Sequence, residues 1–157
     1  MKRILLSIAL LIMLPLPAAH AATQTIYLST IPNRSYLGEI TNKKFEASLA
    51  PDASLGKLVF QPVARPRVWV IDPALVEDAQ YLAAKNSNFA INWIRQLKRV
   101  IAGDHVYAMA YGSPDVKYLS SLAPQELNFY YQVGQQHLEA SLNMNVDTEK
   151  GSGLART

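Results

Sequence analysis

Two runs of apolar residues stand out along the chain, and each gives way to polar, turn-forming positions. Residues 68–71 form an uninterrupted apolar run with β-branched residues, a pattern typical of a strand buried on both faces. Residues 105–111 have a similar character and end at Gly-Ser-Pro-Asp. The intervening segment has helical spacing of its apolar residues, with Trp93 on the apolar stripe. The pattern predicts two parallel strands joined by a helical crossover, with Trp69 and Trp93 in the core.

The crossover divides into two predicted helices. The first covers residues 73–84 and follows Asp72, whose carboxylate can cap it while Pro73 occupies the first turn. The second follows Ser87, a suitable N-cap, and ends near Gly103, which suits the turn after a helix. Two helices between the strands leave enough chain for a standard parallel crossover.

Weaker patterns flank this unit on both sides. Residues 25–29 predict a short strand, 33–52 an irregular polar stretch and 55–60 a short helix. Beyond the second strand, residues 116–122 and 124–144 predict a short and a long helix. Residues 145–157 are polar with a Gly-Ser-Gly element, and we expect a disordered tail.

These elements predict an α/β fold: a small parallel sheet with flanking helices, resembling the opening part of a (β/α) barrel. A complete barrel needs about 250 residues, and the chain has 157. It is therefore either a small three-layer sheet protein or the first portion of a larger barrel. We expect a single domain over residues 22–144.

Residues 1–21 have the pattern of a secretory signal peptide. Lys2 and Arg3 precede an apolar run, and Ala19-His20-Ala21 fits the small-x-small cleavage site. We expect export to a secreted or extracytoplasmic location, with retention of this segment as an anchor as the alternative. No later stretch is long and apolar enough to span a membrane, so no stable membrane span is expected after cleavage.

The composition excludes some classes of chemistry and of partner. The chain contains no Cys, which removes disulfides, thiol chemistry and Cys-ligated zinc, and suits a bacterial envelope protein held by its core. Without Lys2 and Arg3, 13 basic residues stand against 12 acidic ones, so the net charge of +3 gives no argument for a nucleic-acid partner.

Two Asp residues are the candidate catalytic groups. Asp72 and Asp115 each follow a predicted strand, so both belong to the carboxyl edge of the sheet, where ligands usually bind in α/β proteins. Paired carboxylates are the machinery of glycoside hydrolysis. Both residues are also well placed to stabilise a helix N-terminus, and that structural role is the leading alternative.

Tyr111 and Ser113 are the candidate substrate-binding residues at the same edge, with Tyr111 able to stack on a sugar ring. The histidines downstream of the predicted cleavage site, His105 and His137, lack the close spacing of metal ligands, and we expect neither a metal nor a cofactor. No Gly-x-Ser-x-Gly motif or phosphate-binding loop is present.

The runs Trp69-x-x-Asp72-Pro73-Ala74-Leu75, Gly103-Asp104-His105-Val106 and Ala110-Tyr111-Gly112-Ser113-Pro114-Asp115-Val116 carry a family resemblance. Residues 67–116 resemble an uncharacterised actinobacterial family of exported envelope proteins, whose N-terminal region is similar to the (β/α) barrels of glycoside hydrolases and polysaccharide deacetylases. Its genes lie near that of the lipid II flippase. The chain departs from the family at Gly-Asp-His-Val, where the family has Gly-His-Glu-Val.

Three functions follow from these observations. The first is a non-catalytic envelope protein that binds a cell-wall glycan or an envelope protein partner in peptidoglycan processes, as the resemblance implies. The second is a glycoside hydrolase-like enzyme that uses Asp72 and Asp115. The third is a truncated or degenerate barrel fragment without independent activity.

Overall fold

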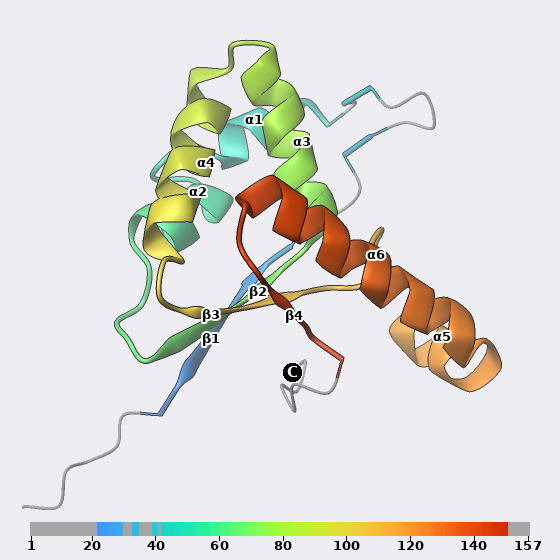
Figure 1. Ribbon diagram of the computed structural model, residues 1–157. Coiled ribbons are helices and arrows are strands. Elements are labelled where there is room, and N and C mark those ends of the chain that lie inside the picture. Colours follow the sequence, from blue (N-terminus) through green and yellow to red (C-terminus); the bar gives the residue numbers. More distant parts are fainter. Residues whose placement is uncertain (1–21, 30–32, 35–38, 41, 151–157) are drawn as a thin grey trace, which may run out of the picture.

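The computed structural model describes residues 22–29, 33–34, 39–40 and 42–150 (Figure 1). Residues 1–21, the predicted signal peptide, and residues 151–157, the end of the predicted tail, lie outside the described residues.

The described residues form one parallel sheet of four strands in the order β1-β2-β3-β4. The strands are β1 (Gln24–Leu28), β2 (Arg67–Ile71), β3 (His105–Ala108) and β4 (Asp147–Thr148). The predicted α/β class, with a parallel sheet and flanking helices, is therefore confirmed, and the strand order is consistent with part of a (β/α) barrel.

Each crossover between neighbouring strands contains two helices. These are α1 (Lys43–Ser48) and α2 (Ser54–Phe60), then α3 (Pro73–Ala84) and α4 (Asn88–Val100), then α5 (Val116–Leu122) and α6 (Pro124–Leu142). Parallel crossovers are almost always right-handed, so strands that pair in chain order place their helices on one face. Figure 1 shows the helices gathered on one side of the sheet.

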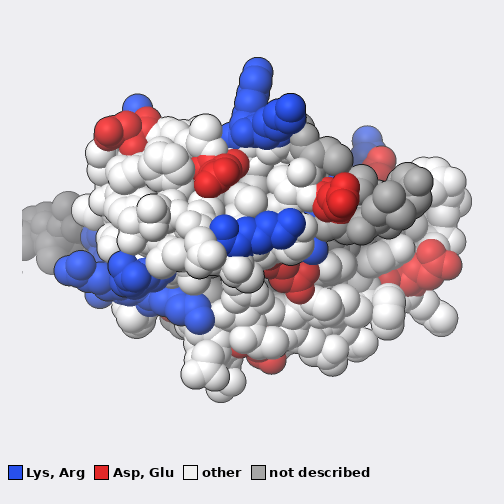
Figure 2. Space-filling view, turned by 90° about the horizontal axis from the view of Figure 1, so that it is seen from above, with Lys and Arg blue, Asp and Glu red and all other residues white. Residues whose placement is uncertain are grey.

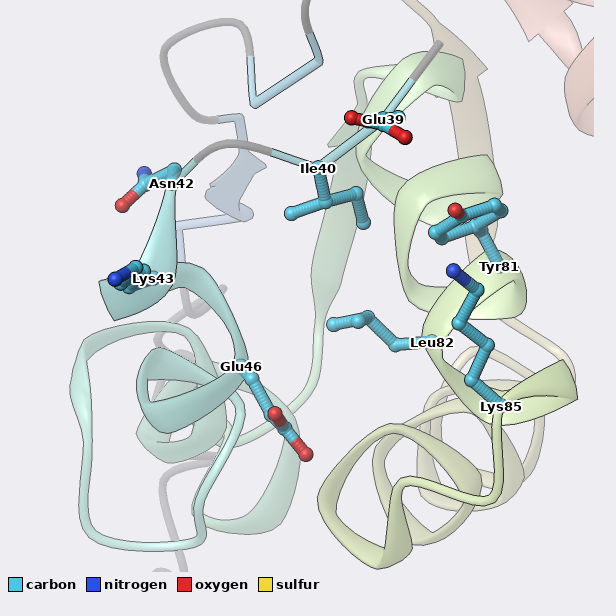
Figure 3. A pocket seen from close by; sticks show the side chains of 8 residues that line it. All are labelled: Glu39, Ile40, Asn42, Lys43, Glu46, Tyr81, Leu82 and Lys85. Atoms are coloured by element: carbon cyan, nitrogen blue, oxygen red, sulfur yellow. The ribbon is translucent and has the colours of Figure 1, made fainter.

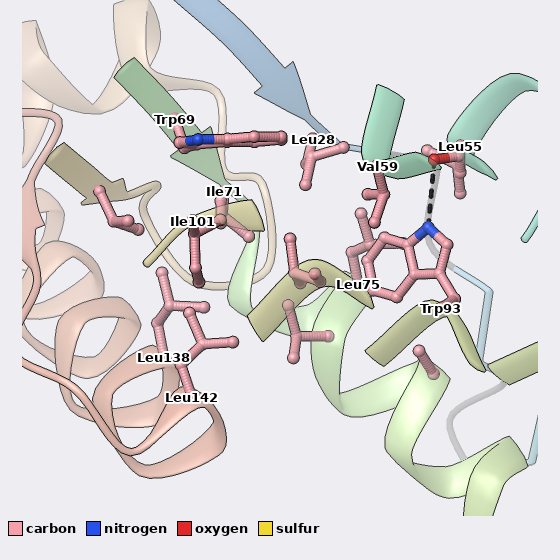
Figure 4. Packing of buried hydrophobic residues seen from close by; sticks show 14 of the residues in the cluster. Leu28, Leu55, Val59, Trp69, Ile71, Leu75, Trp93, Ile101, Leu138 and Leu142 are labelled. Atoms are coloured by element: carbon pink, nitrogen blue, oxygen red, sulfur yellow. Dashed lines mark hydrogen bonds between the residues drawn. The ribbon is translucent and has the colours of Figure 1, made fainter. Parts of the chain in front are cut away.

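One core fills the space between the sheet and these helices (Figure 4). Trp69 of β2 and Trp93 of α4 are both fully buried, as predicted. The Trp93 indole Nε1 donates a hydrogen bond to the Leu55 carbonyl oxygen at 3.1 Å, which ties α4 to α2. Satisfying this buried polar atom allows the large ring to occupy the core without a desolvation penalty.

The predicted disordered tail is wrong for residues 145–150. Strand β4 pairs in parallel with β3, Val146 is buried, and the Glu149 amide donates to the Ala108 carbonyl at 2.9 Å. The strand is held by backbone hydrogen bonds and one apolar anchor. The polar composition of this segment therefore hid its place in the sheet.

Two further boundaries differ from the sequence prediction. Helix α1 forms within the stretch predicted as irregular, because Asn42 caps it by accepting from the Lys44 amide and Phe45 enters the core. Strand β3 ends at Ala108 instead of residue 111, and the Tyr111 amide donates to the Tyr130 carbonyl of α6 at 3.0 Å. The chain thus leaves the sheet and turns toward α6.

Helix α6 passes directly over this departing segment at Gly134. A Cβ atom placed on Gly134 would lie 2.2 Å from the Met109 carbonyl oxygen, far inside van der Waals contact. Only a hydrogen atom fits between helix and backbone here. The closeness of this crossing fixes how α6 lies over the carboxyl end of β3.

The amino end of the sheet is fastened by Asp104, which precedes β3. Its side chain is 3% exposed and pairs with Arg65 at 2.7 Å and Arg67 at 2.8 Å, while Trp69 Nε1 donates to it at 2.9 Å. Burial by itself raises a carboxyl pKa, but the hydrogen bonds from Trp69 and Arg67 and the two guanidinium charges outweigh it. The pKa of Asp104 therefore lies below its usual value.

Candidate functional site

The carboxyl edge of the sheet begins with Asp72, one of the two predicted catalytic residues. It directly follows β2 and is 3% exposed. Its Oδ1 accepts from the Ala74 amide at 3.0 Å, which caps α3, and its Oδ2 accepts from the Ser113 hydroxyl at 3.1 Å. Burial raises the pKa of Asp72, and the two hydrogen bonds oppose that rise without cancelling it.

Asp115, the second predicted catalytic residue, is exposed and caps α5. Its Oδ1 accepts from the Tyr118 amide at 2.9 Å. The predicted helix-capping role is therefore present for both Asp residues. Asp72 caps its helix from the interior and Asp115 from the surface. In the described contacts, the two carboxylates share no hydrogen-bond partner. The second oxygen of Asp72 is also engaged, so this carboxylate has no oxygen without a partner.

Ser113 and Tyr111, the predicted substrate-binding residues, are both bonded to carboxylates within the protein. Ser113 donates to Asp72, as described, from a turn in which its φ is +49°. The Tyr111 hydroxyl donates to Glu77 Oε2 at 2.7 Å. Burial, followed by the hydrogen bond to Glu77, raises the pKa of Tyr111 to about 12, so its proton stays on the hydroxyl near neutral pH.

Glu77 is the centre of this cluster, and sequence reasoning did not find it. Its Oε2 accepts from Tyr111, and its Oε1 pairs with His137 Nδ1 from α6. The rings of His137 and Tyr111 also contact each other, with centroids 4.6 Å apart and planes tilted by 48°. Tyr111, Glu77 and His137 thus form one unit from three elements, which we call the Glu77 cluster.

A shallow cavity of about 390 Å³ opens beside the Glu77 cluster, between α3 and α6. It is lined by Glu77, Gln80, Gln136, His137, Ala140 and Ser141. Gln80 and Ser141 clasp the two helices, since the Gln80 amide donates to the Ser141 carbonyl at 3.1 Å and the Ser141 hydroxyl donates to Gln80 Oε1 at 3.2 Å. The lining is rich in groups that can both donate and accept hydrogen bonds.

The neighbouring carboxylate, Asp78, has a different partner set. It pairs with Arg34 Nε and accepts from Asn33 Nδ2 at 3.1 Å, while Arg34 Nη2 also donates to the Glu77 carbonyl at 3.1 Å. A guanidinium therefore compensates Asp78, whereas the side chain of Glu77 is held by a hydroxyl and an imidazole.

A second hollow of about 290 Å³ lies where α1 faces the end of α3 (Figure 3). Ile40 and Leu82 point into it, and Glu39, Glu46 and Lys85 lie around its rim. The Lys85 ammonium lies 4.5 Å from the centre of the Tyr81 ring, so part of this rim is already occupied by an internal cation–π contact.

The distribution of charged side chains does not point to a particular ligand. In Figure 2, basic and acidic side chains are both distributed over the helical face, among many uncharged residues. Within the described part of the chain, no three His, Asp or Glu residues come together in a way that could hold a metal ion. None of the helices in that part has the length and apolar character needed to cross a membrane.

No family model, curated protein or solved structure matches this chain. The functional conclusion therefore depends on the geometry of the site itself.

Proposed function

We propose that this protein is an exported cell-envelope protein that binds a glycan, without transforming it, in the cavity between α3 and α6. The observation that carries the proposal is the polar lining of that cavity beside the Glu77 cluster. The signal-like residues 1–21 support export, and the resemblance of residues 67–116 to an envelope family supports a cell-wall ligand.

The chemistry of the lining suits a ligand rich in hydroxyl and acetamido groups. Gln136 offers an amide donor and acceptor, the amide of Gln80 is held in place by Ser141, and the ring of His137 is partly exposed, with 44% of the side chain accessible. Because Tyr111 and His137 both bond Glu77, that carboxylate is fixed in place before a ligand arrives. A fixed lining loses less side-chain entropy on binding than a mobile one.

The state of the carboxylates favours binding over hydrolysis. A glycosidase needs one carboxyl group to protonate the leaving oxygen and another to act as base or nucleophile. Asp72 caps α3 and accepts a second hydrogen bond from the Ser113 hydroxyl, and Asp115 caps α5 at the surface. Neither predicted catalytic residue lines the cavity between α3 and α6.

A direct test is co-sedimentation of the protein with purified peptidoglycan, together with calorimetric titration by chitotetraose. We expect Gln136→Ala combined with His137→Ala to weaken binding about tenfold, or roughly 1.4 kcal/mol. Gln132→Ala is the matched control, because Gln132 is an exposed glutamine of α6 that does not line the cavity. Absence of binding to both glycans, or equal binding by the double variant, would overturn the proposal.

One observation favours the hydrolase alternative: burial raises the pKa of Asp72, as a general acid requires. The same protein should then release reducing ends from peptidoglycan, and Asp72→Asn should abolish that release while leaving circular dichroism unchanged. Our proposal predicts no release by either chain.

A further inference from the structure

A third cavity, of about 320 Å³, opens between helices α2 and α4 and shares no lining residue with the cavity between α3 and α6. It is lined by Pro51 from the turn before α2, by Phe60 at the end of α2 and by four residues of α4. Its volume lies within the range of small-molecule pockets. Two phenyl rings and a proline make its lining far more apolar than that beside the Glu77 cluster.

The residues that α4 contributes form a stripe along one side of the helix. Phe89, Asn92 and Gln96 follow one another at spacings of three and four residues, and Arg95 lies beside Gln96. This stripe is separate from the buried side of the helix, which carries Trp93 into the core.

The two phenyl rings of the cavity differ in burial. Phe60 is half-buried and packs against the main core, whereas Phe89 is 47% exposed. A ligand that covered Phe89 would remove a large apolar surface from water, which is favourable in proportion to the area covered. The cavity therefore offers one fixed ring and one ring with surface still to bury.

Arg95 supplies a positive charge at this apolar lining. Its Nη1 donates to Asn92 Oδ1 at 3.0 Å, which holds the guanidinium beside the cavity. Among the described residues, no carboxylate forms a salt bridge with Arg95. α4 itself has no acidic residue, and Lys98 and Arg99 in its last turn add to the positive charge. The remaining N–H groups of Arg95 suit a carboxylate, which a guanidinium can hold through two parallel hydrogen bonds.

These features together specify one ligand chemistry, a flat apolar ring joined to an anionic group. We propose that the cavity between α2 and α4 binds a small aromatic carboxylic acid, with its ring against Phe60 and Phe89 and its carboxylate on Arg95. Gln96 supplies an amide that can hydrogen-bond the same ligand. The two cavities have no residue in common, so this proposal stands or fails independently of glycan binding between α3 and α6.

The test is an NMR titration of the protein, followed through its backbone amides, with phenylacetate and with its neutral analogue phenylacetamide. Both compounds should shift the amide signals of Phe89 and Gln96, and the acid should bind about fivefold more tightly, as expected for a partly exposed ion pair. Arg95→Gln should lower the affinity for the acid to that for the amide. Phe89→Ala should weaken the binding of both compounds, because it removes the ring that they share as a contact.

Arg99→Gln is the matched control, because Arg99 is an exposed arginine of the same helix that does not line the cavity. It should leave the preference for the acid unchanged. The proposal is overturned if neither compound shifts these signals, if the parent chain binds both equally, or if Arg99→Gln removes the preference as fully as Arg95→Gln does. Shifts of the same signals by chitotetraose, with none by phenylacetate, would assign the cavity to a glycan and overturn the proposal as well.

Discussion

Asp104 and Asp72 occupy opposite ends of the same sheet, and both carboxylates are largely shielded from solvent, yet their environments shift their pKa values in opposite directions. At the amino end, two arginines and an indole N–H surround Asp104, and its pKa is lowered. At the carboxyl end, an amide and a hydroxyl hold Asp72, with Asp78 and Glu77 near enough to add to the rise of its pKa.

The difference lies in the charge of the partners, which are cationic at Asp104 and neutral at Asp72. A buried charge with cationic partners strongly prefers its ionised form and mainly fastens the fold. A buried carboxylate with neutral partners keeps part of its desolvation cost, a state that proteins accept more often near ligands than elsewhere. The comparison therefore gives Asp104 a stabilising role as an ionised group, whereas the surroundings of Asp72 oppose its ionisation.

The largest expected effect comes from Asp104→Asn. Removing this charge leaves the nearly buried guanidinium of Arg67 without its partner, so we expect a loss of about 3 kcal/mol in the free energy of unfolding at pH 7. Urea denaturation measures it, with the exposed Asp52→Asn as control. Because the folded pKa of Asp104 is lowered, its contribution is present above the ordinary Asp value of 3.8 and disappears as the pH falls through the folded pKa.

If Asp104→Asn costs no more than Asp52→Asn, the contrast between the two ends of the sheet is wrong.

A smaller effect is expected at the surface of the carboxyl end. Asp115→Ala removes the side-chain acceptor for the Tyr118 amide and should lower the free energy of unfolding by about 1 kcal/mol. Asp115→Asn retains an acceptor and should lie within a few tenths of a kcal/mol of the parent chain. A loss of hydrolytic activity in place of stability would mean that capping is not the main role of Asp115.

The smallest effect at neutral pH, and the sharpest test of the comparison, is Asp72→Asn. The raised pKa of Asp72 means that its protonated form favours folding, so the parent chain loses stability as the pH rises from the ordinary value of 3.8 through the folded pKa. Asn caps a helix about as well and cannot ionise. We expect the free energy of unfolding of the variant to lie within about 1 kcal/mol of that of the parent chain at pH 7. Relative to the parent chain, the variant should be more stable at pH 7 than at pH 3.

Urea denaturation of both chains at the two pH values measures this difference. If Asp72→Asn, like Asp104→Asn, destabilised the protein more at pH 7 than at pH 3, the opposite environments of the two carboxylates would be contradicted.

Local patterns were sufficient to predict the central part of the fold. The apolar run before Asp72, the caps at Asp72 and Ser87 and the stripe containing Trp93 each depend on neighbours in sequence, and the structure confirms all of them. β4 could not be predicted in this way, because its backbone hydrogen bonds to β3 join residues about 40 positions apart and leave no side-chain signature.

The Glu77 cluster escaped prediction for the same reason. His137 lies 60 residues from Glu77, so no local sequence pattern links the two residues. A signal was nevertheless present. Glu77 lies five residues after Asp72, on a helix predicted to start at the carboxyl edge of the sheet, so it was already placed near that edge.

The contact at Gly134 has a consequence for how this site can be lost. His137 follows Gly134 by less than one helical turn on α6, so the rotation of the helix that Gly134 permits also aims the imidazole at Glu77. Any larger residue at position 134 would lift or roll the helix from the Met109 carbonyl. The Glu77 cluster would then be misaligned while every residue that forms it remained unchanged, so the missing side chain of Gly134 sets the orientation of the cluster from outside it.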